Sequence, residues 1–276
     1  MARESTIASA KRIVTVTVTG VSDTGCVREI NEDSFFAQAP IFAVADGMGG
    51  HTRGDLASRA VVESLAHSIR PGVATSPEAV FTALTAANAQ IASWSGEVGI
   101  AGTTVAGLAL VTLSAQTDLH WMAFNIGDSR VYLLDDGEFE QITVDHSAVQ
   151  ELLDQGRITT DEAERHPERN VVTRAVGVDA DADADVWLLP TSGQQTFLIC
   201  SDGLTREVSD DKIRSVLAAN ADDPAGELLR LAIENGARDN VTVLVVRATT
   251  LDPTPPGPGY HENRSLGYLE KTLPRL

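Results

Sequence analysis

Hydrophobic and polar positions along the chain predict a series of strands interrupted by pairs of helices. Short apolar or alternating segments are typical of strands that are buried on one or both faces. They occur at 13–19, 41–45, 103–113, 119–125, 130–134, 138–142, 185–189, 195–201 and 241–247. Apolar residues at helical spacing occur at 55–69, 76–94, 209–219 and 223–235. Because the helices come in pairs and the strands mostly follow one another, this order predicts an α+β protein with antiparallel sheets covered by helices.

The ends of the chain and one helix start define the expected domain. Ser76 followed by Pro77 is typical of a helix start, because serine caps backbone N–H groups and proline fits the first helical position. We expect residues 1–12 to be a flexible N-terminal arm and residues 249–276 to be a Pro/Gly-rich linker and tail. A single folded domain is therefore predicted over residues 13–248.

Charge and cysteine content narrow the class of protein. Asp and Glu outnumber Lys and Arg by 39 to 21, which gives a formal net charge of -18. Nucleic-acid backbones are bound by basic surfaces, so we expect no nucleic-acid partner. The two cysteines, Cys26 and Cys200, are too few for a disulfide scaffold or a cysteine-rich zinc site. The sequence has no run of about 18 apolar residues and no secretory signal, so we expect a cytoplasmic protein without a membrane span.

Four aspartates stand at the ends of predicted strands: Asp46, Asp128, Asp202 and Asp239. Aspartate and Asp-Gly pairs are also common in ordinary turns, because the side chain bonds its own backbone. That explanation is weaker for Asp46 and Asp202, since the chain continues into helical patterns rather than into a hairpin. Four such residues can converge at one rim of a sheet.

Carboxylates gathered at one place indicate a bound cation, because they otherwise repel one another and raise each other's pKa. Ligand sets made only of oxygen suit magnesium, manganese and calcium. The sequence offers no cysteine–histidine spacing for zinc. A site for several metal ions is therefore the hypothesis that the aspartates favour.

Five short motifs follow one another along the chain. They are Arg28-Glu29-Ile30-Asn31-Glu32-Asp33, Asp46-Gly47-Met48-Gly49-Gly50-His51, Gly127-Asp128-Ser129-Arg130, Ser201-Asp202-Gly203 and Arg238-Asp239-Asn240. In this order they resemble the motifs of metal-dependent Ser/Thr protein phosphatases of the type 2C (PPM) class. Residues 143–147, Gly156 and the stretch 170–177 resemble the bacterial branch of that class. The resemblance implies that 13–248 is a phosphatase catalytic domain, an αββα sandwich of two packed antiparallel sheets flanked by helices, with about 145–180 as a flap.

The resemblance also implies two metal ions, Mn2+ or Mg2+, near one end of the sheets. By position, Asp46 bridges both ions, and the Gly47 carbonyl contributes to one of them. Asp202 and Asp239 complete the other ion. Asp128, together with Asp202, resembles the site of a third ion that is typical of bacterial members.

Three further residues match the family's motifs for water and phosphate. Glu32 and Asp33 correspond to residues that hold metal-bound waters, and Arg28 to the phosphate-binding arginine. Paired metals lower the pKa of a shared water, which then attacks phosphorus in line. Eukaryotic relatives carry a histidine proposed as general acid at the position of Met48, so the acid is unassigned here. A metal-bound water or His51 could serve, although we favour a structural role for His51 at a helix start.

Other polar features are expected to be structural. The acidic repeat at 179–185 lacks the glycine and glutamate that an EF-hand loop requires, so we expect a solvated loop. His146 is expected to cap the start of the flap, and Thr103 and Thr104 to pack close to the site. The arginines of the flap, among them Arg174, could contact an anionic substrate or balance the acidic surroundings.

Three functions are compatible with the sequence. An active phosphatase would act as a monomer on phosphoproteins, opposing a bacterial Ser/Thr kinase. A non-catalytic metal-binding or signalling module on the same fold would have lost a ligand. A phosphatase dedicated to one regulatory partner would have the same motifs as the first. Every metal position carries a competent carboxylate, which favours phosphatase activity over the non-catalytic module.

Overall fold

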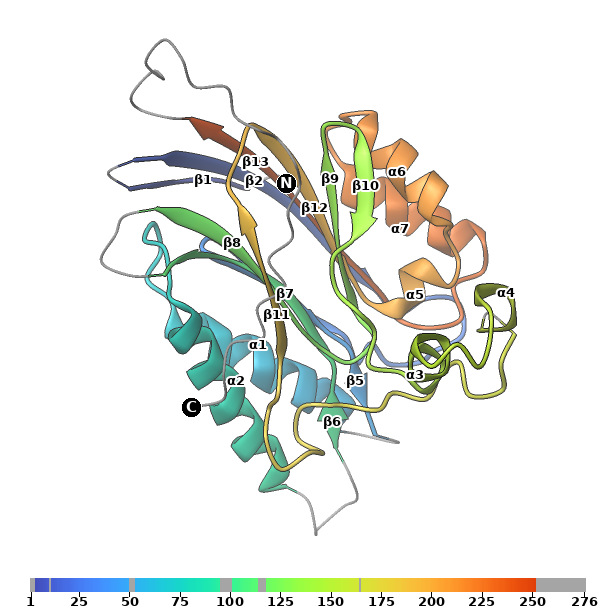
Figure 1. Cartoon of the computed structure of the whole chain (residues 1–276). Helices are drawn as coiled ribbons and strands as arrows, with labels where there is room; N and C mark the ends of the chain where they lie inside the picture. The colour runs from blue at the N-terminus through green and yellow to red at the C-terminus, as the bar shows by residue number, and fades with distance from the viewer. Residues whose placement is uncertain are drawn as a thin grey trace.

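Two antiparallel β-sheets pack face to face, with helices on the outer face of each (Figure 1). The computed structural model describes residues 3–9, 11–49, 53–94, 101–113, 118–163 and 165–251. The first sheet has the order β1 (Arg3–Ala8), β2 (Ile13–Asp23), β13 (Val241–Leu251), β12 (Gln194–Cys200), β9 (Arg130–Asp135) and β10 (Glu138–Gln141). The second has the order β11 (Asp185–Pro190), β8 (Leu119–Ile126), β7 (Val105–Thr112), β4 (Ile41–Ala45) and β3 (Ser34–Gln38). A short pair, β5 (Gly47–Met48) and β6 (Gly102–Thr103), extends from the second sheet's end.

The helices form the two outer layers. Helices α1 (Gly54–Ser68) and α2 (Pro77–Ala92) cover the second sheet, whereas α5 (Asp202–Thr205), α6 (Asp210–Ala218) and α7 (Pro224–Glu234) cover the first (Figure 1). The segment between β10 and β11 carries α3 (Ala148–Asp154) and α4 (Thr160–Ala163). The αββα architecture expected from the resemblance is confirmed.

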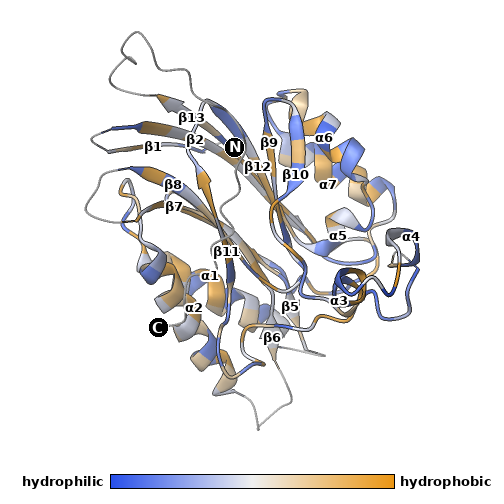
Figure 2. Cartoon of the chain, in the orientation of Figure 1, coloured by the Kyte–Doolittle hydropathy of each residue, from blue (hydrophilic) through white to orange (hydrophobic). Residues whose placement is uncertain are grey.

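Three apolar cores separate the four layers, and β4 shows how one strand serves two of them. All five of its residues are buried. Phe42 and Val44 point into the core between the sheets, and the alternate residues Ile41, Ala43 and Ala45 pack against α1 and α2. Successive side chains of a strand point to opposite faces, so burial on both faces requires a continuous apolar run. In Figure 2 hydrophobic colour runs along the paired strands and along α1 and α2.

The aspartates converge because several strands end at the same end of the sandwich. Within the second sheet, Val105 pairs with Ile126, at the end of β8. The next three residues carry the chain into the first sheet, where Arg130 pairs with Cys200 at the end of β12. The same end of the first sheet holds the start of β13, since Cys200 also pairs with Val243. Loops that follow β4, β8 and β12, or precede β3 and β13, therefore meet there.

Most elements predicted from the hydrophobic pattern are present within a few residues of their expected bounds. Ser76 caps α2 by accepting a hydrogen bond from the backbone N–H of Ala79, and Pro77 is the first helical residue, as predicted. The prediction of a flexible N-terminal arm is wrong for residues 3–8, because they form β1, which pairs with β2. The reason is that Ile7 is buried in the core between the sheets. The expected tail from residue 252 onward lies outside the described residues, and β13 extends to Leu251.

Candidate metal and phosphate site

Asp46 lies in the connection between β4 and β5, where two buried threonines fix its backbone. Its N–H donates to Thr104 Oγ1 at 3.1 Å. Its carbonyl accepts from Thr103 Oγ1 at 2.8 Å and from the Thr104 N–H at 2.9 Å. Because backbone groups in the interior need partners, these bonds allow the backbone of Asp46 to be held at a partly buried position. Thr103 and Thr104 therefore pack beside Asp46, as predicted.

Four further carboxylates surround Asp46. Burial raises the pKa of Asp46 well above its usual range, and the charges of Asp33, Asp202, Asp128 and Asp239 raise it further. Burial also raises the pKa of Asp33 to about 6 and that of Asp202 to about 8. Five neighbouring carboxylates cannot all remain anionic in the interior without protons or cations to share the charge. The structure therefore brings the five predicted aspartates together at one acidic centre.

Two oxygens of this centre show that it fits a hard cation. Asp33 Oδ1 and Asp202 Oδ1 are buried and have no hydrogen-bond partner among the described residues. Ser201 Oγ donates to the other oxygen of Asp33 at 2.8 Å. Leaving a buried carboxylate oxygen unpartnered is costly, whereas a magnesium or manganese ion would satisfy it. As the side chains stand, no three His, Cys, Asp or Glu residues in the described ranges form a group that could hold a metal ion.

The two Asp-Gly pairs of the site require glycine for space. A Cβ on Gly47 would lie 2.2 Å from the carbonyl oxygen of Gly54 and 2.6 Å from that of Glu32. A Cβ on Gly203 would lie 2.0 Å from the carbonyl oxygen of Asn240. Real Cβ atoms do not approach backbone atoms this closely. In these two pairs glycine is therefore needed so that neighbouring backbone segments can approach closely. Asp136-Gly137 differs, because it forms a true hairpin turn in which both residues have positive φ.

Asp128 lies in the turn between β8 and β9, which the segment 143–147 holds in place. The Gly127 N–H donates to His146 Nδ1 at 3.1 Å, and the His146 N–H donates to the Gly127 carbonyl at 2.8 Å. Arg130 donates to both oxygens of Asp145, with distances of 2.7 to 3.0 Å. These contacts join the segment 143–147 to the motif that contains Asp128. They also give His146 a structural role in fixing the Asp128 turn.

Asp239 forms an ion pair with Arg28, the arginine predicted to bind phosphate. Arg28 Nε lies 2.8 Å from Asp239 Oδ1, and Arg28 Nη2 donates to Asp239 Oδ2 at 2.9 Å. Asn240 fastens the loop that carries Arg28: its Oδ1 accepts from the Glu32 N–H at 2.9 Å, and its Nδ2 donates to the Ile30 carbonyl at 3.0 Å. The Arg28 side chain is 54% exposed, so it faces solvent at the rim of the acidic centre.

Glu32 lies two residues before β3, with its carboxylate beside the first residue of α1, and is the outer member of the acidic group. Burial raises its pKa, and the charge of Arg28 opposes that rise. A Cβ on Gly54 would lie 2.5 Å from Glu32 Oε1, so glycine at this position leaves room for the carboxylate. Each predicted site residue is thus placed at the same end of the sandwich. Asp33, Asp128 and Asp202 are buried, Asp46, Asp239 and Glu32 are partly buried, and Arg28 is exposed.

Sequence reasoning missed several residues of this centre. Arg206 contacts Asp202 Oδ2 through Nη2, and its Nη1 lies 3.5 Å from Asp239 Oδ2. The contact of Arg206 with Asp202 could have been predicted from their spacing of four residues, which places both side chains on one helix face. Asn240 belongs to the motif Arg238-Asp239-Asn240, in which only Asp239 was predicted as a site residue. His51, considered as a general acid, lies outside the described residues.

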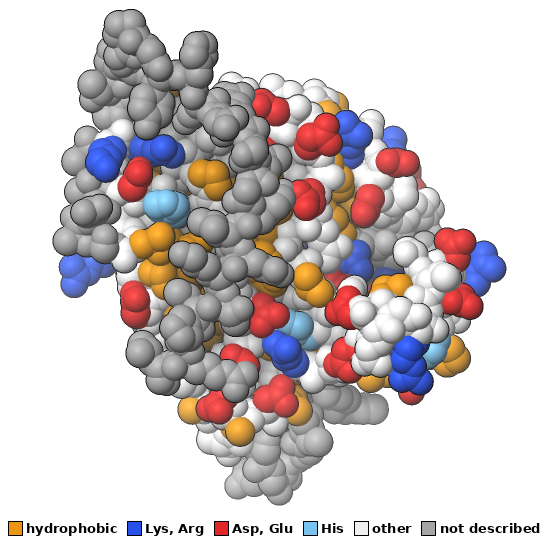
Figure 3. Space-filling model, viewed as in Figure 1, with side chains coloured by type: hydrophobic (Ala, Val, Ile, Leu, Met, Phe, Trp, Pro, Cys, Tyr) orange, Lys and Arg blue, Asp and Glu red, His pale blue; other side chains and the backbone are white. Residues whose placement is uncertain are grey.

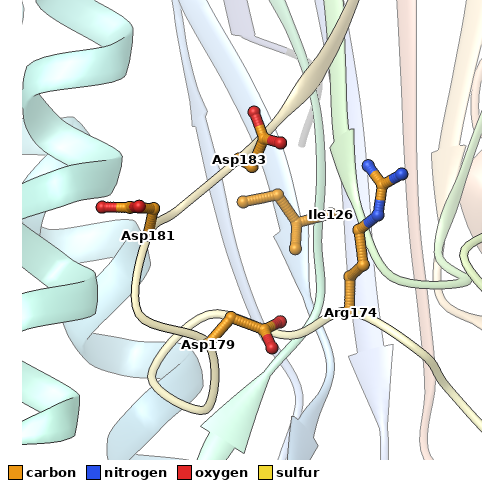
Figure 4. Close-up of a pocket in the computed structure, with 5 residues that line it drawn as sticks. All are labelled: Ile126, Arg174, Asp179, Asp181 and Asp183. Atoms are coloured by element: carbon orange, nitrogen blue, oxygen red, sulfur yellow. The ribbon is translucent and has the colours of Figure 1, made fainter.

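The acidic repeat at 179–185 does not converge on one point. Asp179, Asp181 and Asp183 are exposed and, with Ile126 and Arg174, line a shallow cavity of about 280 Å3. Figure 4 shows the Asp181 carboxylate pointing away from Ile126 and Arg174. The expectation of a solvated loop is confirmed for these three aspartates, whereas Asp185 begins β11 and forms an ion pair with Arg174. On the face drawn in Figure 3, acidic side chains are spread widely with basic ones between them.

Comparison with known proteins places the chain in a family. The family model described as protein phosphatase 2C matches residues 27–229, and the chain belongs to this family. It is 40% identical over 237 residues to the serine/threonine protein phosphatase PstP of Mycobacterium tuberculosis, an alignment that covers 84% of this chain and 45% of PstP. It is 34% identical over 238 residues to the serine/threonine phosphatase stp of Listeria welshimeri, covering 82% of this chain and 93% of that relative.

Solved structures show the same fold. The catalytic domain of the serine/threonine protein phosphatase PstP, crystallised with two manganese ions, superposes with a TM-score of 0.73 at 35% identity. The match covers 87% of this chain and all of that domain. PppA of Pseudomonas aeruginosa matches with a TM-score of 0.72 at 36% identity, over 84% of this chain and 97% of PppA. Among the residues that the structure describes, no helix is long and apolar enough to cross a membrane.

Proposed function

We propose that this chain is a metal-dependent phosphatase that hydrolyses phosphoserine and phosphothreonine in proteins. The observation that carries the proposal is the group of five neighbouring aspartates, three of them buried, beside the exposed guanidinium of Arg28. Anionic side chains at this density suit cations, and a guanidinium at their rim suits a phosphate group. The names of the relatives, which are serine/threonine phosphatases, support the substrate class.

The assignment of residues to metal ions follows the family's motifs. Asp46 would bridge two ions, the Gly47 carbonyl would contribute to one, and Asp202 and Asp239 would complete the other. Asp128 and Asp202 would hold a third ion. The manganese-bound relative supports two ions. The unpartnered oxygen of Asp202 supports its assignment as a ligand.

When bound, the ions would supply a deprotonated water near neutral pH and neutralise charge on the phosphoryl oxygens. The chain itself positions the substrate and the water. Glu32 and Asp33 would hold water at the edge of the acidic centre, in keeping with the unpartnered Asp33 Oδ1. Arg28 would grip two phosphate oxygens with its planar fork, whose direction is set by the contact with Asp239.

The biological setting is proposed from the sequence and the relatives. Phosphoproteins are the proposed substrates, with a bacterial Ser/Thr kinase as the opposing enzyme. A monomeric state and a cytoplasmic location stay predictions. The second candidate function is a phosphatase dedicated to one regulatory partner, which would carry the same motifs.

Release of inorganic phosphate from phosphoserine and phosphothreonine peptides tests the proposal. The purified chain is assayed with manganese, with and without excess chelator. We expect turnover that needs the metal. Turnover of one phosphoprotein but not of generic peptides would favour the single-partner phosphatase. Folded protein without turnover on peptides, phosphoproteins or aryl phosphates would favour the non-catalytic module.

A further inference from the structure

Arg206 bridges two of the carboxylates that are proposed to hold a metal ion. It is the residue directly after α5, and its N–H donates to the Asp202 carbonyl at 2.9 Å, which closes one helical turn. Its Nη2 contacts Asp202 Oδ2, and its Nη1 lies 3.5 Å from Asp239 Oδ2. One guanidinium therefore spans side chains that come from the ends of two different strands.

The positive charge of Arg206 also acts on the buried carboxylates of the acidic centre. It opposes the rise in the pKa of Asp202 and also in that of Asp128. The Asp202 and Asp239 side chains are 12% and 25% exposed, so the pair interactions are only partly screened by water. Arg206 thus neutralises the same carboxylates that a divalent cation would neutralise.

We infer that Arg206 is a built-in counter-ion that competes with metal ions for Asp202 and Asp239. The inference rests on the proposed metal site. A guanidinium on Asp202 Oδ2 and Asp239 Oδ2 disfavours a divalent cation there, because the two positive charges repel each other across the same oxygens. Metal binding therefore displaces Arg206, and the need to displace it weakens metal affinity.

The Arg206 side chain lies where its guanidinium can move away from Asp202 and Asp239. Arg206 is 34% exposed and stands at the end of a helix of one turn, so rotation about its side-chain bonds carries the guanidinium into water. Arg28 differs, because both of its close contacts are to Asp239 alone. Arg206 is the cation that bridges the two carboxylates, and its departure frees Asp202 Oδ2 while Asp239 keeps its contacts with Arg28.

Calorimetric titration of the full chain with Mn2+, after treatment with chelator, tests the inference without measuring activity. The variant is Arg206→Gln, and the control is Arg230→Gln. Arg230 also bridges two carboxylates, Glu227 and Glu234, but on the exposed face of α7. We expect Arg206→Gln to bind Mn2+ about tenfold more tightly than wild type, since one competing charge is gone. The control should match wild type.

Thermal unfolding adds a second readout. Without metal, Arg206→Gln should unfold at a lower temperature than wild type, because the acidic centre loses its counter-ion. With saturating Mn2+, the difference should disappear. If Arg206→Gln does not fold without metal, Arg206→Lys replaces it, and it should bind more tightly than wild type because an ammonium group does not span both carboxylates as a planar fork does.

Two outcomes overturn the inference in distinguishable ways. Equal or weaker Mn2+ affinity in the Arg206 variant, with clear binding by wild type, would leave the metal site intact and reject competition. Absence of Mn2+ binding in wild type and variants alike would reject the proposed metal site itself.

Discussion

Gly203 lies against the backbone of Asn240 so closely that a Cβ on Gly203 would fall 2.0 Å from the Asn240 carbonyl oxygen. This contact brings the start of α5, with Asp202, next to the loop that ends in Asp239. Gly203→Ala should therefore separate the two carboxylates. We expect a loss of about 1–3 kcal/mol of unfolding free energy, the usual cost of overpacking, together with weaker Mn2+ binding.

Gly137→Ala is the matched control for that substitution. Gly137 has a φ of 85° in the β9–β10 turn, and a Cβ there would meet open space. This variant should lose stability through backbone strain alone and keep the Mn2+ affinity of wild type. Unchanged Mn2+ affinity in Gly203→Ala would show that the close approach does not position the site.

Arg28→Lys should impair catalysis without unfolding the protein. Arg28 uses a planar fork on Asp239, and the same geometry suits two phosphate oxygens. Lysine keeps the charge but loses the fork, so kcat/KM should fall roughly 10- to 100-fold, the worth of a charge-assisted hydrogen bond. Unfolding temperature should change little, because the side chain is largely exposed. Wild-type kcat/KM at saturating manganese would remove Arg28 from the phosphate site.

The stability of the metal-free chain should fall as pH rises. Asp33 and Asp202 have folded-state pKa values of about 6 and about 8, whereas an unfolded aspartate titrates near 3.9. The folded chain therefore binds more protons than the unfolded chain between about pH 4 and pH 8, and stability decreases with pH across that window. Differential scanning calorimetry in chelator should show this decline, and Mn2+ should reduce it.

Asp202→Asn isolates the contribution of the acidic centre to that decline. The variant cannot lose a proton at this position, so its unfolding temperature should fall less steeply between about pH 5 and pH 8. Identical slopes in the two proteins would assign the decline to the general negative charge of the chain, which is -18.

His146→Ala should loosen the Asp128 turn. His146 is 6% exposed, accepts from the Gly127 N–H, and its Nε2 lies 3.1 Å from Asp185 Oδ2. Removing the ring leaves a buried N–H without its acceptor, which costs about 1–3 kcal/mol. Urea unfolding should show this loss, and turnover at saturating metal should persist. Complete loss of turnover in the folded variant would give His146 a direct role in the chemistry.

The hydrophobic pattern was sufficient to predict most of the fold because each strand and helix buries a regular face. It missed α5, whose four residues are too few for a helical period, and β3, whose three apolar residues do not alternate with polar ones. It also missed β1, because a polar edge strand with one buried residue, Ile7, has no strand pattern of its own. Residues 3–8 become a strand because they pair with β2, which their own sequence does not indicate.

The candidate site was predictable only as a set of motifs. Asp46, Asp128, Asp202 and Asp239 stand at strand ends, but their convergence depends on two sheets joined through the Asp128 turn. The pairing of Arg206 with two carboxylates could not be read from the chain, since Asp239 lies 33 residues beyond Arg206 in sequence. Contacts of that kind follow from packing rather than from local pattern.

Asp46→Asn gives the most direct test of the central claim that the acidic centre exists to hold catalytic metal ions. Hydrolysis of p-nitrophenyl phosphate with manganese is measured for wild type, for this variant and for Asp181→Asn on the exposed acidic loop, alongside unfolding temperature in chelator. We predict that Asp46→Asn loses metal-dependent turnover yet is at least as stable as wild type without metal, because a buried, repelled carboxylate has been neutralised. Asp181→Asn should keep both properties. Metal-dependent turnover at the wild-type rate in Asp46→Asn would contradict the account.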